Sequence, residues 1–399
     1  MPRIVRTPAK SAALKFVLMI GVLSFFADFT YEGARSITGP FLAILGANAT
    51  IVGIVAGFGE LSGYGLRVFS GRLSERTGKF WPITFFGYII QMASVPLLAL
   101  AATWQIAALF IITERIGKAI RNPPRDVMLS HAAKEIGYGW GFGLHEALDQ
   151  FGAVFGPLLV AFLMSLRSDY RRAFVVLLVP AVIVLILLSI ARWLYPRPED
   201  LEPPAPPDVH AAGLPRVFWI YMTGAALVAA GFADFSLIAF HFEKTRSVAP
   251  DWVPILYAIA MGASGAGSLL FGKVFDRVGV SILVPLTVVT LASAPLVFLG
   301  SFWLALVGAT IWGLGMGVHE SIIPAAVATM VPADRRPSAY GIFTSVYGVF
   351  WFVGSAIIGI LYGISVPGVV VFCLVTQTAS IPIFVLVRKN ARPLSRRLQ

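Results

Sequence analysis

Long apolar stretches follow one another along almost the whole chain, and they limit its fold more than any other feature. A helix needs about 20 mostly apolar residues to cross the hydrocarbon core of a bilayer. We expect twelve such helices, at residues 15–45, 51–70, 82–102, 105–125, 138–164, 173–195, 217–242, 253–272, 281–300, 303–325, 338–362 and 368–387. The sequence therefore predicts an all-α polytopic membrane protein with 12 transmembrane helices.

The composition agrees with this fold class and excludes several others. Hydrophobic residues make up 57% of the chain and charged residues 13%, whereas a typical soluble domain has about 25% charged residues. The net charge of +11 does not indicate binding to nucleic acid, because a nucleic-acid-binding protein carries its Lys and Arg on a polar surface. A single cysteine, Cys373, excludes an intrachain disulfide framework.

Basic residues at both ends predict the orientation in the membrane. The charges of the two tails are all basic: Arg3, Arg6, Lys10, Lys15, Arg388, Lys389, Arg392, Arg396 and Arg397. Because cytoplasmic segments carry an excess of Lys and Arg, we expect both termini in the cytoplasm and an inner (plasma) membrane location. We expect no cleavable signal peptide, since Asp28, Glu32 and Arg35 interrupt the first apolar stretch.

A proline-rich segment at residues 196–215 divides the chain near its midpoint. It contains seven prolines and four acidic residues, a composition typical of a semi-rigid, solvated linker. We expect an N-terminal six-helix bundle at residues 1–195 and a C-terminal six-helix bundle at residues 216–399, joined by this cytoplasmic linker.

The two halves share sequence patterns at corresponding positions. Phe-Ala-Asp-Phe occurs at residues 26–29 and again at residues 232–235, in the first span of each half. After the second span, residues 71–79 align with residues 272–280, and a glycine, an acid, an arginine and a second glycine keep their spacing. Parallel repeats of six spans are the plan of one large class of transporters.

The loop at residues 71–79 resembles the signature loop of the major facilitator superfamily, with the pattern Gly-x-x-x-Asp/Glu-Arg-x-Gly-Arg/Lys. Span count, linker and duplication extend the resemblance over essentially the whole chain. The segments 114–118, 124–126 and 143–149 are similar to a prokaryotic subgroup of mostly unassigned substrate. The resemblance implies two pseudo-symmetric six-helix bundles that rock about a site at the membrane midplane.

The resemblance also implies a cytoplasmic gating role for the repeated loops. The residues concerned are Gly71, Glu75, Arg76, Gly78, Arg125, Asp126, Gly272, Asp276 and Arg277. Glu75 can cap a helix N-terminus, where a carboxylate is favoured, and we expect Arg76 to pair with Asp126. In the alternative interpretation, Gly71 and Gly78 only form a tight turn.

Charged residues inside the predicted spans are the most informative feature for function, because ionisable groups in a bilayer are costly and usually face a partner or a cavity. Most of them fall in the N-terminal half, and two, Asp234 and Glu320, fall in the C-terminal half. The candidate substrate-binding or proton-coupling residues are Asp28, Glu32, Arg35, Glu60, Arg67, Glu114, Lys118, Arg121, His145, Asp149, Asp234, His319 and Glu320. Helical spacing puts the acids of the first span on one face and the bases of the fourth span on another.

Two interpretations of these charges remain open. They can form a structural ion-pair network that holds the N-terminal half rigid. Alternatively, Asp28 or Glu32 exchanges a proton while Lys118 or Arg121 meets an anionic substrate group. A neighbouring base lowers the pKa of a carboxyl group, so Glu32, Glu60 or Asp149 would be better proton carriers if unpaired.

The fifth span combines titratable and small residues. His145 and Asp149 are one turn apart and can form a hydrogen bond suited to proton handling or to helix packing. Gly152, Gly156 and Pro157 resemble the span-five motif of antiporters in the superfamily, although Leu159 and Val160 replace its last glycines. Residues 145–149 lack the second histidine of a His-Glu-x-x-His zinc site, so we expect no metal.

Together these features predict a secondary active transporter of a small amphipathic organic solute, working by proton-coupled efflux (antiport). The alternative is a proton-coupled symporter for uptake of an organic anion, nutrient or siderophore, and a membrane-embedded lipid-modifying enzyme is the third choice. We expect no enzymatic activity and no cofactor, with the proton gradient as the energy source. The expected partners are the solute, protons and the lipid bilayer, with no nucleic acid, and we expect a monomer.

Overall fold

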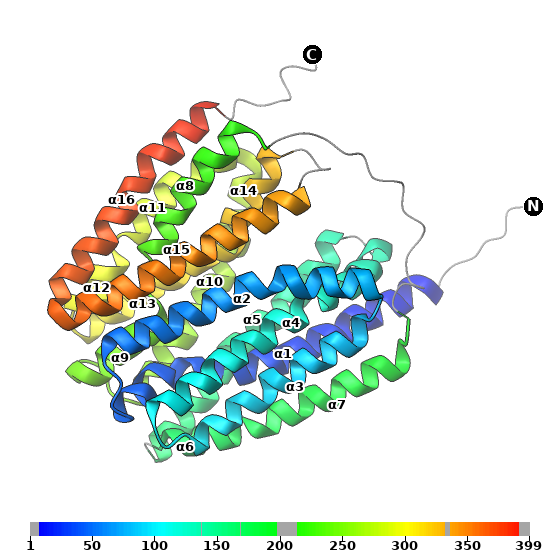
Figure 1. The fold of residues 1–399 in the computed structure, drawn as a ribbon, viewed down its shortest axis with the longest axis horizontal. Helices are drawn as coiled ribbons and strands as arrows, with labels where there is room; N and C mark the ends of the chain where they lie inside the picture. Colours follow the sequence, from blue (N-terminus) through cyan, green and yellow to red (C-terminus); the bar gives the residue numbers. More distant parts are fainter. Residues whose placement is uncertain (1–7, 137, 168, 198–213, 332–335, 391–399) are drawn as a thin grey trace, which may run out of the picture. The chain divides into compact units, whose positions relative to one another are not determined.

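The computed structural model describes residues 8–136, 138–167, 169–197, 214–331 and 336–390. Every regular element in these ranges is helical, which confirms the predicted all-α class (Figure 1). The helices are α1 Pro8–Ile44, α2 Ala49–Thr77, α3 Phe80–Leu97, α4 Trp104–Ile136, α5 Tyr138–Leu166, α6 Tyr170–Val176, α7 Leu178–Leu194, α8 Arg216–Ala230, α9 Phe235–Thr245, α10 Trp252–Val278, α11 Leu283–Thr290, α12 Ser293–Leu299, α13 Phe302–Gly317, α14 Ile323–Met330, α15 Arg336–Ile364 and α16 Val366–Asn390.

Eleven helical segments among the described residues are long and apolar enough to cross a membrane. The expected fourth span lies in α4, a helix of 33 residues that does not meet this test of apolarity. The physical reason is its charge, since Glu114, Arg115, Lys118 and Arg121 follow within two turns. Four other spans consist of shorter helices placed end to end, such as α6 with α7 and α8 with α9.

The chain forms two compact units. The first unit comprises Met1–Ile37 and Ser62–Pro207, and the second comprises Thr38–Leu61 and Asp208–Gln399. The end of α1 and the start of α2 therefore group with the second unit. The predicted limits at residues 195 and 216 stay a prediction, because most of the linker lies outside the described residues.

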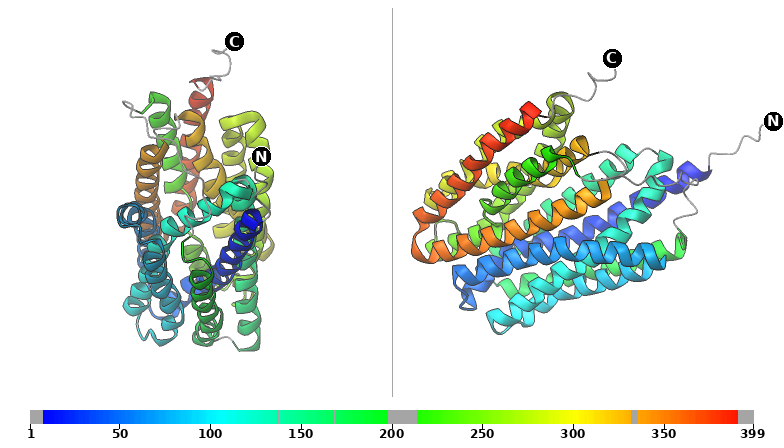
Figure 2. Two further views of the ribbon diagram at one scale, coloured as in Figure 1. Left: turned by 90° about the vertical axis from the view of Figure 1, so that its right-hand side faces the viewer. Right: turned by 45° about the horizontal axis from the view of Figure 1, so that its top comes forward.

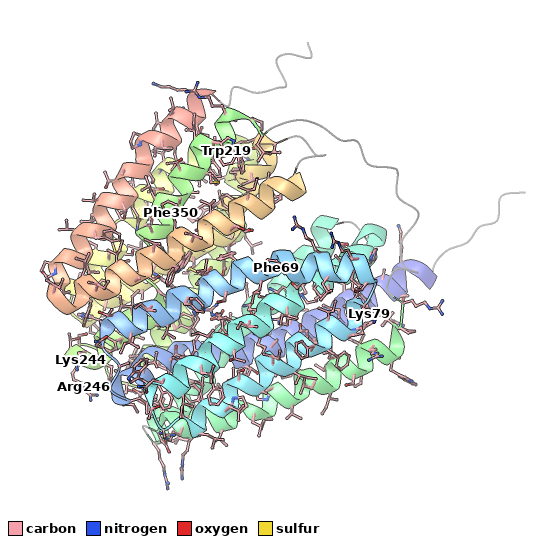
Figure 3. All side chains as sticks on the ribbon, viewed as in Figure 1. Phe69, Lys79, Trp219, Lys244, Arg246 and Phe350 are labelled. Carbon is pink, nitrogen blue, oxygen red and sulfur yellow. The ribbon has the colours of Figure 1, made fainter. Side chains whose placement is uncertain are left out.

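Apolar side chains cover the outer faces of the helices in both units. Phe69, Trp219 and Phe350 are exposed and point outward from α2, α8 and α15 (Figure 3). In a soluble protein such patches would mark binding surfaces. On helices of spanning length they are the faces that meet lipid.

Within the first unit, α3 packs against both α4 and α7 (Figure 1, Figure 2). The contact with α4 is closest where Gly87 faces Arg121 and Gly117 faces Gln91, because a Cβ atom on either glycine would overlap the backbone of the other helix. Small residues let helix backbones approach in this way. The two glycines therefore bring polar side chains of α3 within reach of the charges on α4.

Two further glycines let α5 lie close to α1 in the first unit. A Cβ atom on Gly152 would overlap the carbonyl group of Phe25, and one on Gly156 would overlap that of Phe29. Pro157 follows directly and lies inside α5. The Gly-x-x-x-Gly pattern is thus used for direct backbone packing.

The glycines that end the repeated loops share an unusual backbone conformation. Gly78 has φ of 65° and Gly279 has φ of 61°, a left-handed region that suits glycine. Gly71 and Gly272 lie instead within α2 and α10. The second glycine of each loop therefore makes a turn in both copies.

The first span of each half differs between the copies. α1 runs without interruption through residues 26–29, whereas the matching segment Gly231–Asp234 separates α8 from α9. The broken backbone still finds partners: Gln377 Nε2 donates to the Gly231 carbonyl at 2.9 Å and Trp312 Nε1 donates to the Ala233 carbonyl at 2.8 Å. Irregular backbone inside a membrane protein requires such satisfaction.

The helix contact at Gly156 yields a stability prediction. The variant Gly156→Ala should lower the free energy of unfolding by about 1–3 kcal/mol, because the added methyl group forces α5 away from α1. Gly65→Ala is the matched control, since a Cβ atom there meets nothing within 4 Å. Melting temperatures of the purified proteins in detergent test this, and equal melting temperatures for the two variants would contradict it.

Candidate functional site

Asp28 on α1 lies between two bases of α4 at the centre of a buried charge cluster in the first unit. Its Oδ1 atom is 3.8 Å from Lys118 Nζ and 3.7 Å from Arg121 Nη2. Asp28 is 7% exposed, Arg121 is fully buried and the Lys118 side chain is 20% exposed. One acid of the first span, Asp28, therefore lies against two bases of the fourth span, but at distances beyond a hydrogen bond.

Two side chains of α3 hold the Arg121 guanidinium group. Arg121 Nε donates to Gln91 Oε1 at 2.5 Å, and Nη1 donates to the Tyr88 hydroxyl group at 3.0 Å. The guanidinium carbon also lies 4.4 Å from the centroid of the Tyr88 ring, within the range of a cation–π interaction. Gln91 Nε2 donates in turn to Glu114 Oε1 at 2.7 Å. A continuous chain of polar contacts thus joins Glu114 to Asp28.

Tyr31 supports the same cluster one turn after Asp28. Lys118 Nζ lies 4.2 Å from the centroid of its ring, and the Arg115 guanidinium carbon lies 4.9 Å from it. Arg115 also lies 3.7 Å from the Glu114 carboxylate. The ring therefore fixes two bases of α4 on the α1 side of the cluster.

A second polar chain joins α4, α1 and α5. Arg125 pairs with Asp126 at 2.7 Å and donates from Nη1 to Ser24 Oγ at 3.2 Å. Ser24 Oγ lies 2.8 Å from His145 Nε2. The expected pair of Arg76 with Asp126 is not formed in the structure, because the neighbouring Arg125 occupies that carboxylate and Arg76 is exposed.

His145 and Asp149 do not form the expected hydrogen bond. The imidazole group bonds to Ser24 instead, and within the described residues Asp149 Oδ1 has no hydrogen-bond partner. No described base lies within ion-pair distance of Asp149, although it interacts electrostatically with Asp28, Arg125 and Lys118. A role for Asp149 as a proton carrier stays a prediction.

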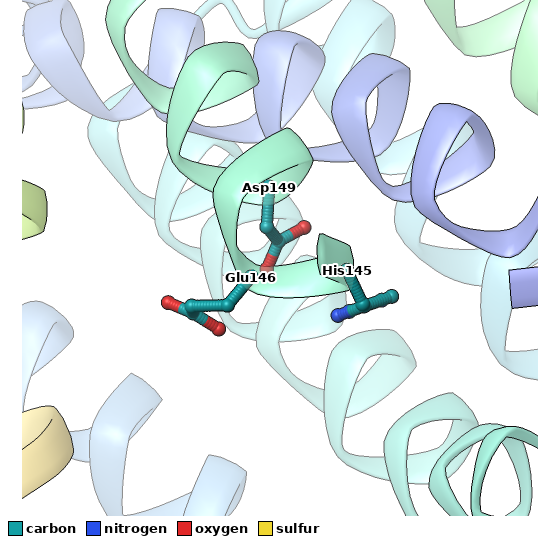
Figure 4. Close-up of side chains that lie close together, drawn as sticks. All are labelled: His145, Glu146 and Asp149. Carbon is teal, nitrogen blue, oxygen red and sulfur yellow. The ribbon is translucent and has the colours of Figure 1, made fainter. Parts of the chain in front are cut away.

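His145, Glu146 and Asp149 lie on one stretch of α5 (Figure 4), each with a ligand atom within 4.8 Å of the others. Glu146 Oε1 already accepts a hydrogen bond from Gln150 at 3.0 Å. Arg125, bonded to Ser24 beside His145, opposes a divalent cation. The absence of a metal site stays a prediction.

The other predicted residues of the first two helices divide between the two units. Glu32 and Arg35 lie in the first unit at 3.9 Å from each other. Arg67 stacks on Tyr64, with its guanidinium carbon 5.2 Å from the ring centroid. Glu60 groups with the second unit and has contacts of its own.

Asp234 and His319 of the second unit make hydrogen bonds within that unit, and the predicted roles of Asp234, His319 and Glu320 in binding or proton coupling stay predictions. Asp234 Oδ1 accepts from the Ser236 backbone N–H at 2.9 Å and so forms the N-cap of α9. His319 bonds through Nδ1 to the Tyr347 hydroxyl group and lies in a π-helical turn, Val318–Ile322, among aromatic rings. Glu320 in the same turn is exposed and has a partner. Asp28 and Asp234, the matching aspartates of the repeat, therefore have different partners, two bases for Asp28 and a backbone N–H group for Asp234.

The gating residues are described only in part. Arg76 and Arg277 are exposed at the ends of α2 and α10. The side chains of Glu75 and Asp276 lie outside the described residues, so their predicted gating contacts stay predictions.

Four uncharged residues of the cluster were not predicted from the sequence: Ser24, Tyr31, Tyr88 and Gln91. Gln91 had a usable signal, because an amide in an apolar span is expensive unless it is hydrogen-bonded. Serine and tyrosine are too common in spans to single out.

Helices of spanning length with charged residues buried among them are typical of membrane transporters. The family model of the Major Facilitator Superfamily matches residues 17–355 and 237–398 of this chain. An uncharacterised protein of Mycobacterium tuberculosis (strain H37Rv) is 38% identical over 97% of this chain and 96% of its own length. The chain belongs to the major facilitator superfamily.

More distant relatives carry transporter names. An uncharacterised MFS-type transporter of Methanocaldococcus jannaschii is 26% identical over 88% of this chain and 89% of its own length. The multidrug resistance protein MdtH of Cronobacter sakazakii is 29% identical, over 47% of this chain and 45% of its own length. The solved structure of the nucleoside transporter NupG has a TM-score of 0.71 at 14% identity, covering 93% of this chain and 98% of that chain, and shows the fold.

The role of Asp234 as a cap can be tested directly. Asp234→Ala should lower the free energy of unfolding by about 1 kcal/mol, whereas Asp234→Asn keeps an accepting oxygen atom and should have a smaller effect. Melting temperatures in detergent measure both. If the two variants are equally destabilised, the charge of Asp234 matters and the cap does not.

Proposed function

We propose that the chain is a proton-coupled secondary transporter that exports a small amphipathic organic solute from the cell. The observation that carries the proposal is the position of Asp149, a carboxylate beside the buried cluster with no ion pair among the described residues. Such a carboxylate can take up and release a proton without first breaking an ion pair. Asp28 is less suited to this role, because Lys118 and Arg121 face it.

The cluster also couples a proton to the solute in electrostatic terms. Asp149 interacts with Asp28 and with Lys118, so a change in its charge alters the field at the residues around Asp28. Charges in a medium of low dielectric constant interact strongly over several ångströms. A solute that contacts Lys118 or Asp28 therefore responds to the protonation of Asp149.

Two observations support an amphipathic solute and export. The second unit contains a cluster of buried rings, formed by Phe232, Trp312, His319, Tyr347 and Trp351. The partial relatives named MdtH are multidrug resistance proteins, which favours export.

A second candidate function is proton-coupled uptake of an organic anion. It is favoured by the two bases that converge on Asp28, since an anionic solute can contact Lys118 and Arg121. The direction of transport separates the two candidates.

Purified protein reconstituted into liposomes tests both candidates with two probes, the amphipathic cation ethidium and radiolabelled benzoate. Under an imposed pH gradient, export by antiport predicts movement of a probe opposite to the protons, and symport predicts movement with them. Each movement should stop when a protonophore removes the gradient. Failure of both probes to move beyond empty liposomes would contradict the proposal in this form.

The assignment of Asp149 gives a sharper prediction. Asp149→Asn should lower the rate of transport driven by the pH gradient about 100-fold or more, because the amide cannot carry the proton. Exchange of labelled for unlabelled probe without a gradient should continue. Asp251→Asn is the matched control, since Asp251 makes no cap hydrogen bond at the start of α10. Equal gradient-driven rates in both variants would overturn the assignment.

A further inference from the structure

Nine buried polar side-chain atoms among the described residues of the first unit have no hydrogen-bond partner, and three of them gather around one ion pair that is held apart. These three are Asp28 Oδ1, Arg121 Nη2 and the hydroxyl group of Tyr31. Leaving a buried charged group without its hydrogen bonds carries the full cost of removing that group from water. Such groups therefore need a functional or structural reason.

The geometry of Arg121 shows why its Nη2 atom stays without a partner. Arg125, one turn along the same helix, reaches Asp126 at 2.7 Å, while Arg121 stops 3.7 Å from Asp28. The difference lies in α3, because Gln91 and Tyr88 bind the Nε and Nη1 atoms of Arg121. Arg121 is therefore held back from a direct ion pair.

The orientation of the Gln91 amide follows from its partners. Gln91 is fully buried, with a guanidinium group on one side and the Glu114 carboxylate on the other. A guanidinium group can only donate and an ionised carboxylate can only accept. Gln91 therefore accepts from Arg121 through its oxygen atom and donates its N–H to Glu114.

Lys118 provides the side from which a ligand atom can approach. Its side chain is 20% exposed, whereas Asp28, Tyr31 and Arg121 are each at least nine-tenths buried. The centroid of the Tyr31 ring lies 4.2 Å from Lys118 Nζ. The carboxylate of Asp28 is 3.8 Å from the same atom, which is too far for a hydrogen bond. Lys118 Nζ and Arg121 Nη2 are thus two donors that face the same acceptor, Asp28 Oδ1, beyond hydrogen-bond distance.

We infer that Lys118, Arg121 and Tyr31 bind one oxyanion group, a carboxylate or a phosphate, of an organic solute. Asp28 is the internal competitor for the two bases, and Gln91 is the positioning residue that keeps Arg121 from closing on Asp28. The inference adds the chemical class of the solute to the proposed function. It rests on that function in one respect, that the bound anion is the solute that is transported. Asp149 of α5 interacts electrostatically with Asp28, and Glu114 is joined to Arg121 through Gln91.

Binding can be measured on the purified full-length protein in detergent, without vesicles or a gradient. The probes are benzoate and phenyl phosphate, with benzamide as the neutral control of nearly the same shape. Melting temperature is followed against probe concentration at constant ionic strength. We expect a saturable rise with at least one of the two anions and none with benzamide, and the stronger anion identifies the oxyanion.

Two variants separate a binding site from a structural network. Gln91→Met removes both hydrogen bonds while keeping the volume, so Arg121 can pair with Asp28 and anion affinity should fall about tenfold or more. Asp28→Asn removes the competitor, so affinity should rise about tenfold even though the protein without anion melts lower. The second variant keeps the test valid if the first does not fold.

The matched controls are Gln150→Met, at a glutamine that binds only Glu146 in α5, and Asp169→Asn, which retains the cap of α6. Both should bind the anions as the unchanged protein does. The inference is overturned if neither anion gives a saturable rise, or if all variants respond alike. It is also overturned if Asp28→Asn weakens binding. Transport without anion binding would refute this inference alone, whereas binding without transport would refute only the proposed function.

Discussion

The cost of burying charge is the constraint on which the first unit depends. Arg121 is fully buried, so its guanidinium group must find partners within the protein. It finds them in Gln91 and Tyr88 on α3, a helix brought close by Gly87 and Gly117. The arrangement of Lys118, Asp28 and Tyr31 follows from where this one group is held.

Hydropathy was sufficient to predict the helices, because a span needs only length and apolar residues. The fold class and the resemblance to the major facilitator superfamily follow from patterns in the sequence. Asp28, Lys118 and Arg121, which lie close together in the structure, were among the candidate residues. The fourth span was predicted at residues 105–125 from its apolar residues, and α4 contains this segment although its charges keep it below the apolarity of the other spans.

The parts that sequence patterns did not predict depend on individual contacts. A helical spacing allowed a hydrogen bond between His145 and Asp149, but Ser24 on another helix took the imidazole group. Asp28 and Asp234 looked equivalent in the repeat, yet a break in the backbone turned the second into a helix cap. Such outcomes depend on which neighbour is nearest in space, and spacing along one helix does not contain that information.

The break between α8 and α9 has a mechanical consequence for the second unit. A gap in a helix is ordinarily a soft joint, at which the two pieces can bend independently. Here Gln377 of α16 donates a hydrogen bond to the Gly231 carbonyl, and Trp312 of α13 donates one to the Ala233 carbonyl. Any bending at the joint must therefore drag two other helices with it or break both bonds. The two hydrogen bonds therefore couple a movement of α9 relative to α8 to α13 and α16.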